Sequence, residues 1–199
     1  MCPSTVGSPP LGSPQPKSPS DTPQTGPRTS LHSRAETQDD LGMLTELVIR
    51  RLLIGDQVAA SKFGTGRPID DPAREHRELE LVRHQARRSG LGPDKTTVFF
   101  RNQIGASKIV QRGLFAHWAA HPDQIPATRP DLNAIRARLD RLTGDLLDEL
   151  KRTQHLRSAP TDCAGQLARS VRAGSVLYRL DGLHRQALEI ATRSVCGSA

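Results

Sequence analysis

The residues that could do chemistry in this 199-residue chain are cations placed where an apolar helix face is expected. At about 100° per residue, a helix that begins near Asp40 presents one inward stripe. Its members are Leu44, Leu47, Arg51, Ile54, Val58 and Lys62. Arg51 and Lys62 are about three helical turns apart, and Arg74 follows at the start of the next expected helix. Because burial of an unpaired charge is costly, these inward cations need anions.

The negative charge could come from carboxylates of the protein or from a bound ligand. Asp56 and Asp71 could form structural ion pairs with nearby arginines, which explains one buried cation more easily than several that converge. The next helix adds neutral hydrogen-bonding groups at i, i+4 spacing, flanked by apolar residues. These polar residues are Gln103, Ser107 and Gln111, and their apolar neighbours are Phe100, Ile104 and Leu114. The pattern predicts a dry pocket for a small polyanion.

The expected pocket lacks the groups that covalent or metal chemistry needs. Ser107 has no candidate histidine base at a diagnostic spacing, so acyl transfer is not supported. The seven histidines form no metal-ligand pattern, and His76 and His84 are predicted to lie on the surface. We therefore expect no metal and no cofactor, and chemistry that relies on positioning and electrostatics.

The elements that must position these residues are all predicted to be helices, packed as one bundle of about six in residues 39–199. Residues 1–38 hold eight of the fifteen prolines and no aromatic residue, which predicts a disordered tail. Caps and prolines mark the boundaries, with Asp71 as the cap of the second helix. The predicted helices run from about Asp40 to Phe63, Pro72 to Ser89, Pro93 to His121, and from after Asp131 to Arg157, followed by a hairpin that breaks near Ala173 to Ser175.

Composition narrows the choice of partners and compartment. The net charge of +7 favours anionic partners, but aromatics make up only 3% and basic residues alternate with acidic ones, so we expect no nucleic acid. No apolar run is long enough to predict a membrane span. No apolar segment typical of an export signal is recognisable, which favours the cytoplasm. Cys163 and Cys196 bracket the last hairpin and could form a disulfide outside the cytosol, or be two buried thiols.

The order and spacing of several residues resemble the all-helical AroQ-type chorismate mutases. They are Arg51, Lys62, the segment SKFGTGRPIDDPARE with Asp71, Arg74 and Glu75, and Ser107 and Gln111 in FFRNQIGASKIVQ. The resemblance to the exported, gamma-type subclass extends over about 160 residues, including LFAHW, PDLNAIRARLD and the terminal cysteine pair. It implies a secreted or periplasmic enzyme whose partners are chorismate and a second copy of the chain in a homodimer.

The resemblance also implies roles in the rearrangement of chorismate to prephenate. Lys62 and Gln111 would donate to the ether oxygen, and Glu75 or Glu78 would bind the substrate hydroxyl. The carboxylates would be bound by Arg51, Arg74, Ser107 and Arg136, the last completing the site from the same chain. Shorter intracellular members borrow an arginine from a partner's first helix, and Arg34 has the corresponding spacing here. The alternative is a binding or effector module that kept the fold and pocket without catalysis.

Overall fold

The computed structural model describes residues 40–197, and within them every regular element is helical. The predicted tail and Arg34 lie outside this range. The elements are α1 (Asp40–Lys62), α2 (Pro72–Arg88), α3 (Pro93–Ala120), the 3₁₀ helix η1 (Pro122–Gln124), α4 (Leu132–Arg152), α5 (Gln154–Arg157), α6 (Pro160–Leu177) and α7 (Gly182–Thr192). The prediction of an all-α bundle is confirmed. No helix in the described part of the chain is long and apolar enough to cross a membrane.

Local signals in the sequence start the helices that later form the site. The side chain of Asp71 caps α2 by accepting the backbone N–H of Arg74 at 3.0 Å. Asp131 caps α4 in the same way, accepting from Asn133 and Ala134 at 3.3 and 2.9 Å. Proline occupies the first turn of both α2 and α3, where its missing N–H costs nothing.

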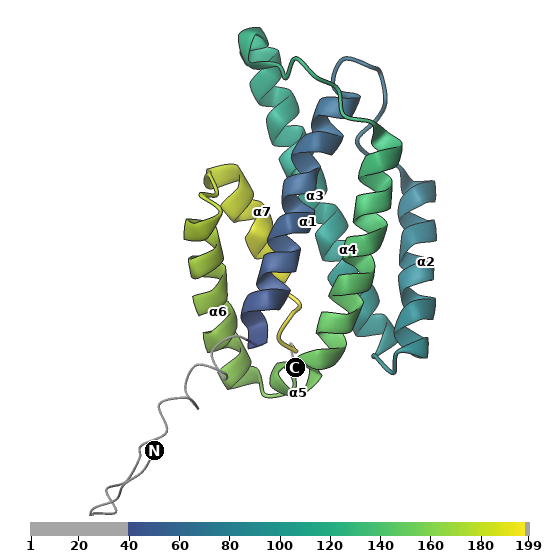
Figure 1. Cartoon of the computed structure of the whole chain (residues 1–199), viewed down its shortest axis with the longest axis vertical. Helices are drawn as coiled ribbons and strands as arrows, with labels where there is room; N and C mark the ends of the chain where they lie inside the picture. The colour runs from purple at the N-terminus through teal and green to yellow at the C-terminus, as the bar shows by residue number, and fades with distance from the viewer. Residues whose placement is uncertain (1–39, 198–199) are drawn as a thin grey trace, which may run out of the picture. The chain divides into compact units, whose positions relative to one another are not determined.

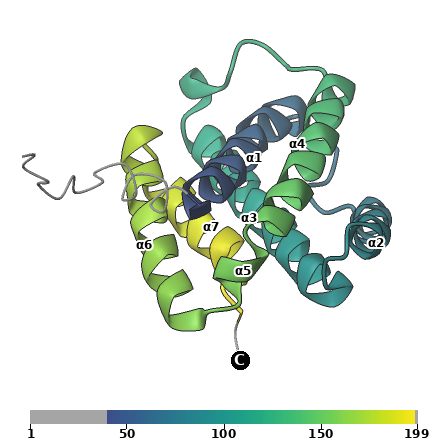
Figure 2. The ribbon, with the colours of Figure 1, turned by 60° about the horizontal axis from the view of Figure 1, so that its bottom comes forward.

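Helices α1 and α3 form the centre of the bundle. α1 packs against α3, α4, α6 and α7, whereas α3 also supports α2 on its outer side (Figures 1 and 2). The side chains between them exclude water almost completely. The largest fully buried ones include Leu44, Ile49, Ile54, Phe99, Phe100, Leu146 and Leu188. Because α1 is covered on several sides, its two chemically interesting cations are presented from a rigid element.

Two predicted boundaries in the second half of the chain are wrong. The fourth helix ends at Arg152, and a separate one-turn helix follows it. The final hairpin does not break near Ala173 to Ser175 but after Leu177, where Arg179 takes a positive φ of 49°. Gly174 lies inside α6 because α1 passes close by: a Cβ there would lie 2.5 Å from the Cδ1 atom of Ile49. This glycine serves helix packing rather than a turn.

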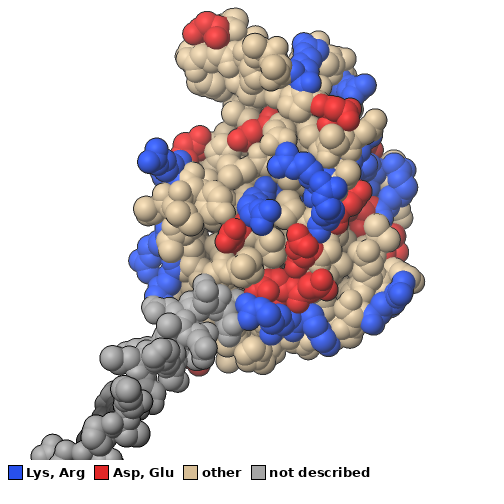
Figure 3. Space-filling model, in the orientation of Figure 1, with Lys and Arg blue, Asp and Glu red and all other residues tan. Residues whose placement is uncertain are grey.

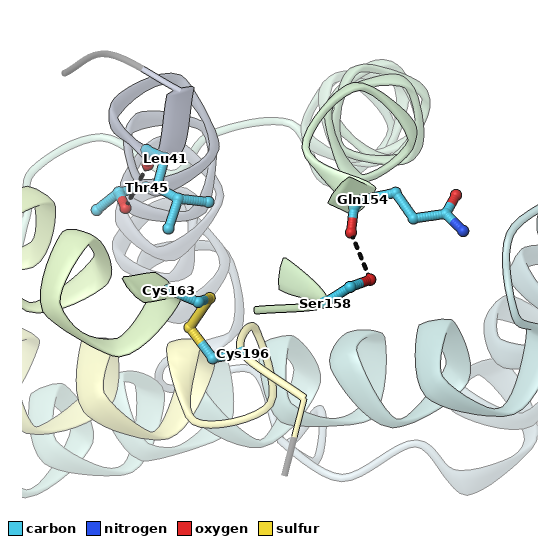
Figure 4. Close-up of a disulfide and its surroundings, with 6 residues drawn as sticks. All are labelled: Leu41, Thr45, Gln154, Ser158, Cys163 and Cys196. Atoms are coloured by element: carbon cyan, nitrogen blue, oxygen red, sulfur yellow. Dashed lines mark hydrogen bonds between the residues drawn. A yellow bond between two sulfur atoms is a disulfide. The ribbon is translucent and has the colours of Figure 1, made fainter. Parts of the chain in front are cut away.

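A disulfide joins Cys163, in the first turn of α6, to Cys196, after α7 (Figure 4). The two Cα atoms are 5.7 Å apart, and Cys163 is fully buried. The bridge connects residues 33 positions apart and closes the α6–α7 hairpin beside the N-terminal turns of α1. Of the two expectations for this pair, the disulfide is confirmed and the pair of free thiols is wrong.

Candidate active site

A cavity of about 590 Å³ lies among α1, α2, α3 and α4. All nine residues predicted for catalysis or substrate binding line it, although they come from four helices and span much of the chain. They are Arg51, Lys62, Asp71, Arg74, Glu75, Glu78, Ser107, Gln111 and Arg136. The structure therefore brings the whole predicted set together, and their individual roles stay predictions.

Arg51 is the most deeply buried cation of the cavity, with only 6% of its surface exposed. Its Nη2 atom forms an ion pair with Glu78 of α2, and its guanidinium lies 5.9 Å from the ring centre of Phe100. Its Nη1 atom is buried and has no hydrogen-bond partner among the described residues. One carboxylate thus anchors Arg51 while part of its fork stays available to an anion.

The structural ion pairs considered from the sequence are not the ones that form in residues 40–197. Asp56 bonds to His184 instead of to an arginine, at 2.9 Å from Nε2. The carboxylate of Asp71 caps α2. Glu78, which lies 27 positions after Arg51, provides the partner that sequence reasoning assigned to other residues.

Lys62 ends α1 with its ammonium turned toward the connection to α2. Its Nζ atom donates to the backbone carbonyl of Ile69 at 3.2 Å. Burial is the main cause that lowers its pKa below 10.5; nearby Asp71 opposes this shift, whereas Arg136 and Arg74 add to it. The mutual repulsion of these cations marks a point where a ligand with negative charge would be stabilised.

Ser107 and Gln111 lie one turn apart on α3 and face the cavity together. The Gln111 amide nitrogen donates to the Ser107 hydroxyl at 3.1 Å, while its Oε1 atom is buried without a partner in the described residues. Rotation of the amide by 180° would let the hydroxyl donate to Oε1 and would place the Nε2 donor where the unpartnered Oε1 now lies. Gln103, the third member of the polar stripe, is occupied elsewhere: its amide donates to the carbonyl of Ala191 at 2.8 Å.

The fourth helix completes the wall with Arg136. Its Nη1 atom makes one long hydrogen bond, 3.4 Å, to the side chain of Asn133, and it forms no ion pair within the described range. Arg136 comes from the same chain as the other lining residues. This placement supports the expectation that a single chain builds the cavity.

Sequence reasoning missed several charged residues at the cavity. Lys108 bonds to Glu75 and Asp70, and Arg112 bonds to Asp70. Arg67, in the connection between α1 and α2, also lines the cavity. Lys108 and Arg112 directly follow Ser107 and Gln111 in the sequence. Their i, i+4 spacing could have indicated that both lie on the same side of α3, next to the predicted polar stripe.

The lining carries a positive surplus suited to a dianion. Among the described residues that line the cavity, six cations stand against four carboxylates, which leaves two net positive charges. The cations are Arg51, Lys62, Arg67, Arg74, Lys108 and Arg136, and the carboxylates are Asp71, Glu75, Glu78 and Asp131. On the outer face formed by α1 and α4, by contrast, basic side chains have acidic ones beside them (Figure 3). A cavity with this charge, set among the helices of the described residues, is suited to a small organic anion.

Comparison with known proteins narrows this class. Residues 42–112 match the family model described as chorismate mutase type II. A secreted chorismate mutase of Mycolicibacterium smegmatis is 36% identical over 165 residues, which cover 83% of this chain and 91% of that protein. The crystal structure of a chorismate mutase from Burkholderia thailandensis superposes with a TM-score of 0.75 at 39% identity, covering 79% of this chain and 99% of that one. The chain belongs to the chorismate mutase type II family, as its site motifs predicted.

A further relative aligns with this chain over a similar length. The secreted chorismate mutase of Mycobacterium tuberculosis is 34% identical over 164 residues, covering 82% of each chain. The similarity therefore extends well beyond α1–α3, into the disulfide-bonded C-terminal half.

Proposed function

We propose that the protein is a chorismate mutase that converts chorismate to prephenate in the cavity among α1–α4. The observation that carries this proposal is the convergence of Arg51, Lys62, Arg74 and Arg136 on one pocket that also holds the Gln111 amide. Family membership supports the same activity. In this reaction an ether C–O bond breaks while a C–C bond forms, within one molecule.

The protein has to position the substrate and stabilise charge, without proton transfer or a covalent intermediate. Holding the two ends of the substrate in a reactive geometry removes much of the entropic barrier. Negative charge gathers on the ether oxygen in the transition state, where preorganised donors stabilise it most. Lys62 and, after rotation of its side-chain amide, the Nε2 atom of Gln111 are proposed as those donors, since both residues line the cavity and Lys62 is held by the Ile69 carbonyl.

The two substrate carboxylates are assigned to the remaining cations. Arg51, with its unpartnered Nη1 atom, and Ser107 would bind one of them, and Arg136 would close over it from α4. Arg74, at the start of α2, would bind or back the enolpyruvyl carboxylate. Asp71 contributes by capping the helix that carries Arg74.

Of the two carboxylates considered for the substrate hydroxyl, Glu78 is favoured. Both oxygens of Glu75 are engaged, by Lys108 at 2.7 and 2.8 Å and by the backbone N–H of Asp71 at 3.2 Å. In the described part of the chain Glu78 has a single ion pair, with Arg51, and 22% of its side chain is exposed. A second oxygen of Glu78 is thus available as an acceptor in the cavity.

The decisive experiment is the loss of chorismate absorbance on addition of purified protein. Wild type is expected to catalyse the decay, and Lys62→Ala to lower kcat by about 10²- to 10³-fold, because a preorganised donor to developing charge contributes about 3 to 4 kcal/mol. Lys95→Ala is the matched control, since Lys95 lies exposed on α3 outside the cavity lining. Folded wild type that binds chorismate without any decay would instead establish the non-catalytic binding module.

We also propose that the protein is exported and acts as a homodimer with a complete site in each chain. The disulfide supports an oxidising compartment, and two relatives are named secreted enzymes. Detection of the oxidised protein outside the cytoplasm tests export, and recovery in the cytoplasmic fraction with both thiols free would contradict it. Sedimentation of the full chain tests the dimer.

A further inference from the structure

A cluster of four charged residues lies at the rim of the cavity, where the α1–α2 connection meets α3. Lys108 Nζ is 2.9 Å from Asp70 Oδ1 and 2.7 Å from Glu75 Oε1. Arg112 Nη2 donates to both oxygens of Asp70 at 2.9 and 2.8 Å. Asp70 thus accepts hydrogen bonds from two cations on successive turns of α3. We call three of the four residues, Asp70, Lys108 and Arg112, the latch.

The connection held by the latch has few backbone hydrogen bonds of its own in the described structure. It runs from residue 63 to residue 71, and two of its glycines, Gly64 and Gly66, have positive φ angles of 70° and 74°. Its inner backbone bonds are confined to the turn at its start, where Thr65 N–H donates to Lys62 O at 3.0 Å. Glycines in such conformations leave the unconstrained chain many alternatives. Side-chain contacts therefore hold the second half of the connection: Asp70 pairs with Lys108 and Arg112 of α3, and the Asp71 N–H donates to Glu75 Oε1 of α2 at 3.2 Å.

That second half touches the proposed ether-oxygen donor. The carbonyl that accepts from Lys62 Nζ belongs to Ile69, the residue directly before Asp70. Lys62 has a long flexible side chain, and in the described residues this carbonyl is its hydrogen-bond partner. A displacement of Asp70 away from α3 would move the Ile69 carbonyl and release the ammonium from its position.

We propose that Asp70 and Lys108 are positioning residues, which close the α1–α2 connection onto α3 and thereby hold Lys62 in its reactive place. This inference rests on the proposed mutase activity of the same cavity. Asp70 is not among the described residues that line the cavity, and it would act through Ile69 and Lys62. Lys108 also fixes Glu75, one turn into α2, so that one ammonium aligns the connection and the helix that follows it.

A simpler explanation is that these are surface ion pairs that contribute little to the stability of the fold and nothing to catalysis. The side chain of Asp70 is 50% exposed, and exposed pairs contribute little to global stability. A small contribution to stability is compatible with a large effect on rate, however, since a misplacement of about 1 Å in an active site can cost about 100-fold. The two explanations therefore differ in kinetics rather than in melting temperature.

The test compares kcat and KM for wild type, Asp70→Ala and Asp70→Glu, using the full chain. We expect Asp70→Ala to lower kcat by about tenfold and to change KM by less than about threefold, with an unchanged melting temperature. Asp70→Glu, which restores the carboxylate, should recover most of kcat. Asp123→Ala is the matched control, because Asp123 is exposed on η1 and does not line the cavity.

Salt provides a second readout that a merely structural role would not produce. Exposed ion pairs are screened as ionic strength rises. At saturating chorismate, kcat of wild type should fall with added sodium chloride, whereas kcat of Asp70→Ala should be low and insensitive to salt. Hydrogen exchange of the amides in residues 63–71 should accelerate in Asp70→Ala, while exchange in the core of α1 and α3 stays unchanged.

The outcomes separate this inference from the function on which it depends. Active wild type with a fully active, normally salt-sensitive Asp70→Ala would overturn the positioning role and leave the mutase activity standing. Equal losses in Asp70→Ala and Asp70→Glu with a lowered melting temperature would also overturn it, in favour of a structural role. Wild type without activity would overturn both, and hydrogen exchange would then still report whether Asp70 holds the connection.

Discussion

At the scale of single residues, the cavity works by giving each cation some, but not all, of the partners it can accept. Among residues 40–197, Arg51 pairs with one carboxylate and leaves its Nη1 atom without a partner, and Lys62 donates to one backbone carbonyl. Full pairing would neutralise the site, whereas no pairing would make burial too costly. Partial pairing leaves donors aimed at the cavity.

Gln111 offers a test of the ether-oxygen role through pH. An amide donates at any pH, so wild-type kcat/KM should be flat through neutral pH. It should fall on the alkaline side as Lys62 loses its proton, at a pH below 10.5 because the pKa of Lys62 is lowered. In Gln111→Glu only the protonated carboxyl can donate, so activity should be highest in acid and decline as that group ionises.

The measurement is kcat/KM from about pH 4 to pH 9, a range that spans the titration of an ordinary or raised glutamate. Gln186→Glu, at an exposed position on α7, adds the same charge away from the cavity and should keep the wild-type profile. A Gln111→Glu enzyme with a flat profile would exclude Gln111 as the donor.

At the scale of elements, two features attach the C-terminal hairpin to the helices that line the cavity. One is the close packing of α3 against α7, and the other is a hydrogen-bonded group of His184, Asp56 and Asp181, which we call the clamp. α3 and α7 approach so closely that a Cβ at Gly113 would lie 2.5 Å from a Leu183 methyl carbon. Beside this contact His184 bridges two helices: Nε2 bonds to Asp56 of α1 at 2.9 Å, and Nδ1 bonds to Asp181 at 2.8 Å. Asp181 also caps α7.

This clamp predicts a loss of stability at alkaline pH. The hydrogen bond to Asp56, assisted by Asp181 and opposed by burial, raises the pKa of His184 from 6.5 to about 9. A raised pKa in the folded state means that the stabilisation is complete below about pH 6.5 and is lost as pH rises toward 9. We expect a loss of about 1 to 2 kcal/mol, less than the full shift implies, because solvent screens the partly exposed carboxylates.

Urea unfolding at the two ends of this pH range measures the effect. The difference in unfolding free energy between the two pH values should be smaller in Asp56→Asn, because this substitution weakens the clamp. Every variant also carries Cys2→Ser, which avoids thiol exchange at high pH. Asp148→Asn, an exposed change on α4, should behave as wild type. An alkaline loss of the same size in Asp56→Asn would rule out the clamp as its cause.

At the scale of the whole molecule, the part that binds the anion and the part that is cross-linked are distinct. The cavity is built by α1–α4 and their connections, whereas the disulfide closes the hairpin of α6 and α7. The hairpin supports α1 and α3 from the side opposite α2 and α4 (Figure 2). Removal of the disulfide should therefore affect stability much more than the chemistry.

A bridge between residues 33 positions apart is expected to contribute about 3 to 4 kcal/mol to the free energy of unfolding by restricting the unfolded chain. Unfolding by urea, with and without reductant, measures this quantity, and the Cys163→Ala/Cys196→Ala double variant serves as the permanently open form. At a temperature where that variant is still folded, its kcat/KM should equal that of wild type. A large loss of kcat/KM in the folded variant would show that the hairpin also shapes the cavity.

Sequence alone determined the features that depend on neighbours within a turn or two. Helix starts at Pro72 and after Asp131 follow from capping by nearby side chains, and the cationic stripe of α1 follows from the helical period. Helical period and spacing predicted a site with Arg51, Lys62, Arg74, Ser107 and Gln111, whereas the family resemblance assigned Asp71, Glu75, Glu78 and Arg136 to it.

Only the tertiary structure decided which distant groups meet. The partner of Arg51 is Glu78 rather than a nearer aspartate, and His184 pairs with Asp56 from 128 positions away. The hairpin breaks after Leu177, and Gly174 lies inside α6 at the point where this helix touches Ile49 of α1. Capping and periodicity act along one helix, whereas these choices depend on the distances between helices, which packing of the whole core sets.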